Sequence, residues 1–177
     1  MGTVSNYRFD RLRVLLVDGS AHMRRLVSTI LRGFGVVEIA ELDTADQAWA
    51  KLRDINPDVV ILDWVLEGMS GIEFAKRVRT AEESPNPHMP LIMLTGETRA
   101  DHVREARDAG INEFLAKPVT PKALMARLCS VVENPRAFVR SEIYAGPCRR
   151  RHRASAYEGP RRRTDEAAPA TTTNRTS

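Results

Sequence analysis

The sequence predicts an α/β fold, a (βα)5 doubly wound parallel sheet followed by a mostly disordered C-terminal tail. From Leu12 to about Val132, short apolar runs alternate five times with segments whose apolar residues recur at helical spacing. After Asn134-Pro135 the alternation stops. The remaining chain is rich in Arg, Pro, Gly, Ala and Thr, and has too few apolar residues to build a second core.

Short, mostly apolar runs are typical of strands buried in a parallel sheet. Such runs predict strands at Leu12–Val17, Val36–Ala40, Val59–Leu62, Leu91–Leu94 and Glu113–Ala116. Parallel strands need crossover connections, and these are right-handed in nearly all proteins. The intervening segments predict the crossover helices at Ser20–Gly33, Thr44–Ile55, Gly71–Thr80, Arg99–Ala109 and Thr120–Val132.

We expect three segments: an N-terminal tail at 1–10, a domain at 11–133 and an arginine-rich tail at 134–177. The arginine-rich tail differs in net charge from the rest of the chain. Residues 1–133 carry 17 Lys and Arg against 19 Asp and Glu, a net charge of −2. Residues 134–177 carry 10 Arg, no Lys and 4 acids, a net charge of +6. Arg without Lys favours planar, bidentate or stacked contact with phosphate or a base over general solvated charge.

Several classes of protein are excluded by composition. No apolar run approaches the length of a membrane span, and Met1–Asp10 lacks the order of a signal peptide, so we expect a cytoplasmic protein without membrane insertion. The two cysteines, Cys129 and Cys148, do not suggest a disulfide framework. We also expect no enzyme in the usual sense.

Polar side chains follow four of the predicted strands. In a doubly wound sheet, sites form outside the carboxyl ends of the strands. Two carboxylates there can hold Mg2+ through oxygen, and a lysine can neutralise an incoming phosphoryl group. One carboxylate can accept that group as an acyl phosphate. The residues concerned are Asp18, Asp63, Thr95 and Lys117, and the Lys117-Pro118 bond is a candidate cis peptide.

These residues stand in a set of ordered motifs that resembles the receiver domain of response regulators, a flavodoxin-like fold. The resemblance is closest to the chemotaxis regulator CheY and covers about residues 12–132. It implies that Asp63 is the phosphoacceptor and that a histidine kinase is a partner. The motifs are Leu15-Leu-Val-Asp18, Met23-Arg-Arg25, Pro57-Asp-Val-Val-Ile-Leu-Asp63-Trp64, Gly68-Met-Ser-Gly71, Met93-Leu-Thr95 and Lys117-Pro118.

One position departs from the receiver pattern. Receivers usually carry two consecutive acids after the first strand, the second of which binds Mg2+, but here Asp18 is followed by Gly19. Only Asp18 and Asp63 remain as metal-binding carboxylates, which should weaken Mg2+ binding. Two hypotheses follow. Either Asp63 is still phosphorylated, slowly or with an altered metal site, or the domain is a pseudo-receiver that serves as a docking platform.

The C-terminal tail contains one motif twice. Tyr144-Ala-Gly-Pro-Cys-Arg-Arg-Arg151 returns thirteen residues later as Tyr157-Glu-Gly-Pro-Arg-Arg-Arg163. We expect the Gly-Pro pairs to form turns. Arg can bind the O6/N7 edge of guanine, and Tyr can stack on a base. A ligand with two guanines, two phosphates and near two-fold symmetry fits these demands, and cyclic di-GMP is such a ligand.

A receiver with an arginine-rich extension resembles the Cle group of CheY-like cyclic-di-GMP effectors. That resemblance implies that the tail binds cyclic di-GMP and that the protein then docks on the flagellar motor switch to control motility. The stretch from Arg136 to Tyr144 could become a short strand or helix on binding. The expected ligand-binding residues are Arg140, Tyr144, Gly146, Pro147, Arg149, Arg150, Arg151, Arg153, Tyr157, Arg161, Arg162 and Arg163.

Three alternatives stay open. The protein can be a single-domain regulator driven by phosphorylation of Asp63, with a tail that only adds charge. The tail can be a solvated basic patch. It can also bind nucleic acid, against which stands the lack of any helix-turn-helix pattern after residue 134.

Overall fold

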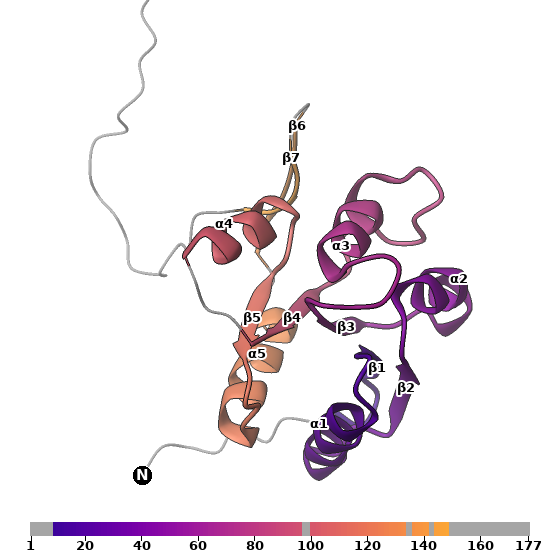
Figure 1. The fold of residues 1–177 in the computed structure, drawn as a ribbon, viewed down its shortest axis with the longest axis vertical. Helices are drawn as coiled ribbons and strands as arrows, with labels where there is room; N and C mark the ends of the chain where they lie inside the picture. Colours follow the sequence, from indigo (N-terminus) through magenta and orange to yellow (C-terminus); the bar gives the residue numbers. More distant parts are fainter. Residues whose placement is uncertain (1–8, 97–99, 134–135, 142–143, 149–177) are drawn as a thin grey trace, which may run out of the picture.

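Five parallel strands form a central sheet in the order β2-β1-β3-β4-β5, which confirms the predicted fold class. The computed structural model describes residues 9–96, 100–133, 136–141 and 144–148. Figure 1 shows how the helices surround the sheet. The strands of this sheet are β1 (Arg13–Val17), β2 (Glu38–Leu42), β3 (Val59–Asp63), β4 (Leu91–Thr95) and β5 (Glu113–Ala116). The helices are α1 (Ala21–Gly33), α2 (Ala45–Ile55), α3 (Gly71–Thr80), α4 (Ala100–Asp108) and α5 (Pro121–Glu133).

Two apolar layers cover the two faces of the sheet. Successive side chains of a strand point to opposite faces, so a strand covered on both sides must be apolar throughout. In β1, Leu15 and Val17 pack with residues of α2, α3 and α4, whereas Val14 and Leu16 pack with α1 and α5. The continuous apolar runs of the sequence therefore correspond to strands between two layers of helices.

Strand β2 begins two residues later than the sequence predicts, at Glu38 instead of Val36. Val36 is buried, but its N–H donates to the carbonyl oxygen of Leu31 at 3.1 Å. Gly35 precedes it with a φ of 90°, a conformation that commonly ends helices. Val36 is thus part of the end of α1, and the apolar character that suggested a strand comes from packing against that helix.

A two-stranded antiparallel hairpin follows α5 and is composed of β6 (Phe138–Ser141) and β7 (Tyr144–Pro147). The expectation that regular structure ends at Asn134-Pro135 is therefore wrong for residues 138–141 and 144–147, which form strands. Gly146 and Pro147 pair with Val139 and Phe138, so they lie in a strand and do not form the predicted turn. The Tyr144 hydroxyl donates to the Pro147 carbonyl at 2.7 Å, which fixes the ring beside the strand.

The hairpin packs on the turn between α4 and β5. A Cβ atom placed on Gly146 would lie 2.8 Å from the Cα atom of Gly110 and 2.6 Å from the Tyr144 hydroxyl, so the two backbones touch where only glycine fits. On the other strand, the Phe138 ring lies 4.1 Å from the His88 ring, centroid to centroid. Figure 1 shows the hairpin extending from this region beyond α3 and α4.

An ion pair joins the start of this C-terminal segment to the sheet. The carboxylate of Glu113 on β5 is buried and accepts a hydrogen bond from Arg136 at 2.8 Å. It also accepts one from the Ser130 hydroxyl at 3.0 Å and pairs with Arg127 at 3.4 Å. A buried carboxylate is stable only with such partners. The chain after α5 is thus held to the α/β domain by charge as well as by packing.

Within the described residues, no helix is both long enough and apolar enough to cross a membrane.

We predict that Gly146→Ala displaces the hairpin while the five-stranded core stays folded. The added methyl group would meet backbone at Gly110, which cannot move aside as a side chain can. Hydrogen exchange should show faster exchange for the amides of residues 138–141 and 144–146 and unchanged exchange in β1, β3 and β4. Gly33→Ala is the matched control because no atom lies within 4 Å of its Cβ position. Wild-type protection of the hairpin in Gly146→Ala would contradict the prediction.

Candidate functional sites

The first candidate site lies at the carboxyl ends of β1, β3 and β5, where the structure brings Asp18, Asp63 and Lys117 together. The Lys117 ammonium nitrogen is 3.0 Å from an oxygen of Asp18 and 3.0 Å from an oxygen of Asp63. Parallel strands place their carboxyl ends at one edge of the sheet, so residues about 45 and 100 positions from Asp18 become its neighbours. The predicted grouping of these three residues is observed.

Local backbone contacts hold each of these groups. The Asp18 side chain accepts a hydrogen bond from the Ser20 N–H at 2.8 Å, and the Arg24 guanidinium donates to the Asp18 carbonyl at 2.6 Å. The backbone N–H of Lys117 donates to the carbonyl of Thr95 at 2.8 Å. Thr95 itself is buried at the end of β4. The Lys117-Pro118 peptide is cis, as predicted.

The two carboxylates differ in access to solvent. The Asp18 side chain is 1% exposed and the Asp63 side chain is 14% exposed. The Trp64 N–H, at 2.8 Å, and Lys117 both contact the same oxygen of Asp63, Oδ1. Among the described residues nothing donates to its Oδ2 atom. Asp63 is therefore the more accessible of the two carboxylates.

Burial and the neighbouring opposite charges shift the pKa values of Asp63 and Lys117 in opposite directions. Burial raises the pKa of Asp63, and the positive charge of Lys117 only partly offsets that rise. Burial lowers the pKa of Lys117, but its hydrogen bonds to Asp63 and Asp18 and their charges outweigh that effect and raise it above its ordinary value. The lysine thus stays protonated at neutral pH and neutralises one of the two carboxylates.

The carboxylates that the structure places at this edge are those of Asp18 and Asp63. Mg2+ prefers six oxygen ligands in octahedral geometry, and here one oxygen of each carboxylate is already paired with Lys117. In the described part of the chain, no group of three or more His, Cys, Asp or Glu is arranged to hold a metal. At Gly19, where the receiver pattern has an acid, a Cβ atom would meet only the carbonyl of Asp43, at 3.9 Å. A Cβ atom at this position therefore meets no steric clash, but the residue is glycine and supplies no carboxylate.

The second candidate site is on the hairpin, which carries four of the predicted ligand-binding residues. Arg140 is exposed on β6, and Tyr144 is half-buried on β7 with Gly146 and Pro147 buried after it. The other predicted residues lie outside the described part of the chain: Arg149, Arg150, Arg151, Arg153, Tyr157, Arg161, Arg162 and Arg163.

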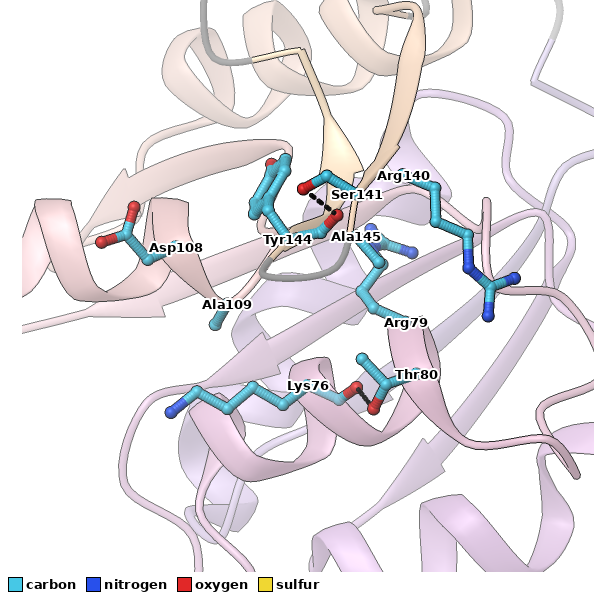
Figure 2. Close-up of a pocket in the computed structure, with 9 residues that line it drawn as sticks. All are labelled: Lys76, Arg79, Thr80, Asp108, Ala109, Arg140, Ser141, Tyr144 and Ala145. Atoms are coloured by element: carbon cyan, nitrogen blue, oxygen red, sulfur yellow. Dashed lines mark hydrogen bonds between the residues drawn. The ribbon is translucent and has the colours of Figure 1, made fainter.

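A pocket of about 360 Å³ lies between the hairpin, α3 and the end of α4. Figure 2 shows its lining residues, with Tyr144 and Ser141 from the hairpin above and Lys76 and Thr80 from α3 below. Of the predicted ligand-binding residues, Arg140 and Tyr144 line it. No sequence pattern selects Lys76, Thr80 and Asp108, because tertiary contact alone brings them to the hairpin.

Arg79, which also lines this pocket, could have been noticed in the sequence. It stands seven residues after Ile72 and four after Ala75, so it lies on the apolar face of α3. Its side chain is 2% exposed, and burial lowers the pKa of the guanidinium to about 10. A charged residue on the buried face of a helix indicates a specific set of partners.

Comparison with known proteins assigns the sheet and its helices to a family, but the match does not include the hairpin. Residues 14–129 match the response regulator receiver domain family. Chemotaxis protein CheY of Pseudomonas aeruginosa is 34% identical over 123 residues, which are 70% of this chain and 98% of that protein. Chemotaxis protein CheY1 of Helicobacter pylori is 36% identical over 119 residues, which are 66% of this chain and 94% of that protein.

A solved structure agrees with these sequence matches. The chemotaxis response regulator CheY4 of Vibrio cholerae has a TM-score of 0.63 and 34% sequence identity, and the match covers 68% of this chain and 98% of that one. These relatives are matched almost from end to end. This chain continues further, and the family match ends before β6.

We predict that Gly19→Asp increases the affinity for Mg2+ by at least about tenfold, because it adds a carboxylate beside Asp18 where space is available. Trp64, which follows Asp63, allows the titration to be followed by fluorescence. Gly33→Asp introduces the same charge on α1, away from the site, and should leave the affinity unchanged. Equal Mg2+ affinity in Gly19→Asp and wild type would show that Gly19 is not what weakens the site.

Proposed function

The chain belongs to the response regulator receiver family, and we propose that it is a CheY-like signalling protein, not an enzyme, that binds cyclic di-GMP through its arginine-rich C-terminal segment. In this proposal the receiver spans residues 11–133, after a short N-terminal tail at 1–10, and residues 134–177 form the ligand-binding extension. The protein acts in the cytoplasm. The observation that carries the proposal is that the first Tyr-x-Gly-Pro motif lies in a hairpin packed against the receiver.

The chemistry of the extension fits a guanine dinucleotide. Arg presents two parallel N–H groups that match the O6/N7 edge of guanine or a phosphate, and Tyr offers a face on which a base can stack. The hydroxyl of Tyr144 is bound to the Pro147 carbonyl, so its ring is fixed before a ligand arrives. Arg140, on the neighbouring strand, forms no ion pair with a described residue and is available to an anion. The repeated motif would supply a second arm for a ligand with two-fold symmetry.

The receiver would serve as the output surface. The hairpin touches the turn between α4 and β5, so ordering of the extension by a ligand would alter this side of the receiver. Several relatives are chemotaxis proteins by name, which supports a partner in the chemotaxis and motility apparatus. We propose the flagellar motor switch as that partner.

Phosphorylation of Asp63 is the second candidate function. It is favoured by the ammonium group of Lys117 at 3.0 Å from the carboxylate, which would neutralise a transferred phosphoryl group. A histidine kinase would be the donor: the Asp63 oxygen would attack phosphorus, and the phosphorus–nitrogen bond of the kinase would break. The incomplete donor set for Mg2+ argues that this reaction is slow. Nucleic acid is a poor candidate ligand, because no helix-turn-helix pattern follows residue 134 in the sequence.

We predict that the double variant Arg149→Ala/Arg150→Ala loses cyclic-di-GMP affinity by about 100-fold or more, as two charge-assisted contacts are removed. Calorimetric titration of the full chain measures this, with GTP and a single-stranded oligonucleotide as competing polyanions. Arg25→Ala/Arg32→Ala removes two exposed arginines from α1, on the opposite face of the sheet, and should bind like wild type. Unchanged affinity in the first double variant, or equal binding of all polyanions by wild type, would reduce the extension to a general basic patch.

We predict that Asp63→Asn leaves cyclic-di-GMP affinity within about twofold of wild type. Asp63 lies at the carboxyl end of β3 and does not line the hairpin pocket, so neutralising it removes no ligand contact. The same calorimetric titration tests this, with far-ultraviolet circular dichroism as a check on folding. A large loss of affinity would mean that the two sites are coupled and that phosphorylation regulates ligand binding.

A further inference from the structure

We propose that the pocket between α3 and the hairpin is a subsite for a phosphate group of the nucleotide, so that the receiver itself supplies part of the ligand-binding site. Lys76 and Thr80 of α3 would act together with Arg140 of the hairpin. The inference rests on the proposed function and extends it, because it places ligand-binding residues inside the receiver, where neither the repeated motif nor the family match locates any.

The shape of the pocket suits a small anionic group flanked by a base. Its volume of about 360 Å³ is at the lower end of the range for ligand sites, roughly 300–1,000 Å³. Tyr144 forms one wall, and its ring is held by the hydrogen bond to Pro147. A base stacked on that ring would carry its phosphate toward α3, where Lys76 and Thr80 lie in Figure 2.

The charges around the pocket are predominantly positive. Lys76, Arg79 and Arg140 line it, and Asp108 is the single acidic residue among the lining residues. Figure 2 shows Lys76 and Arg140 extending to opposite sides of the pocket. Neither forms an ion pair with a carboxylate of the described residues, so both can turn to an anion between them. Together the four charges leave a net of +2 for a phosphodiester to neutralise.

Arg79 adds a positive charge that pairs with no carboxylate of the described residues. Its side-chain N–H groups donate to the carbonyls of Pro87 and Met89, to that of Gly110 and to the side chain of Asn112, at 2.7–3.0 Å. All these acceptors are neutral oxygens. The guanidinium therefore has no donor left for a ligand, but its charge beneath the pocket attracts an anion through a medium of low dielectric constant.

The hydroxyl groups of the pocket can complete the contacts. Thr80 donates to the Lys76 carbonyl at 2.9 Å, and Ser141 donates to the Tyr144 carbonyl at a long 3.4 Å. Both side chains are exposed and can rotate to donate to a phosphate oxygen. Together with the ammonium of Lys76 and the guanidinium of Arg140, these hydroxyl groups would allow α3 and the hairpin, which are distant in sequence, to hold one phosphate.

The test compares two lysine variants with the same loss of charge. Lys76→Gln should weaken cyclic-di-GMP binding by about tenfold, the effect of losing one charge-assisted hydrogen bond. Lys51→Gln, at an exposed position on α2 outside the pocket, should bind like wild type. Calorimetry on the full chain measures both affinities, and thermal unfolding verifies that both variants fold. Inorganic phosphate is titrated as a second ligand.

The outcomes separate this inference from the proposed function. If wild type binds cyclic di-GMP and Lys76→Gln binds as well as Lys51→Gln, the subsite is wrong and the proposed function stands. If wild type does not bind cyclic di-GMP at all, both the subsite and the proposed function are wrong. If inorganic phosphate binds as tightly as the dinucleotide and loses affinity in Lys76→Gln, the pocket is a site for free phosphate and the assignment to a nucleotide is overturned.

Discussion

Burial of the parallel sheet on both faces is the constraint on which the other features depend. It requires apolar side chains along every central strand, so polar chemistry can appear only where the strands end. Asp18, Asp63 and Lys117 stand at those ends, and the ammonium of Lys117 allows the buried Asp18 to lie near Asp63. The same two-layer packing places α3 and α4 on one face, where they provide the surface on which the hairpin rests.

The buried guanidinium of Arg79 organises that surface. Removing a charge from water is costly unless hydrogen bonds replace the hydration. Arg79 finds them in the segment before β4 and in the turn after α4, so it joins three parts of the chain at one point. The Cζ atom of Arg79 lies 5.8 Å from the centre of the Phe138 ring, so the guanidinium also faces the hairpin. The hydrogen bonds of Arg79 thus hold together the side of the receiver against which the hairpin packs.

The sequence predicts the five strands and five helices because apolar periodicity is a local property, and it locates Asp18, Asp63 and Lys117 because topology fixes where strands end. It predicts β6 only as one of two alternatives, a strand or a helix formed on binding, and it does not predict β7. Val139, Arg140 and Ser141 are exposed, so the apolar signal that marks a strand is weak there. The hairpin depends instead on the contact of Gly146 with Gly110, and the pocket with Lys76 depends on the hairpin. Such contacts join distant residues and have no periodic signal.

The ion pair between Glu113 and Arg136 bears on the modularity of the protein. The family match ends before the hairpin, which on its own would suggest that the extension is structurally independent of the receiver. Yet Glu113 is buried inside the receiver, and one of its partners belongs to the extension. The receiver and the extension therefore share a buried ion pair, and replacing the extension alone would leave the Glu113 carboxylate without one of its partners. Exchange of extensions between related receivers would require the carboxylate and its arginine to be transferred together.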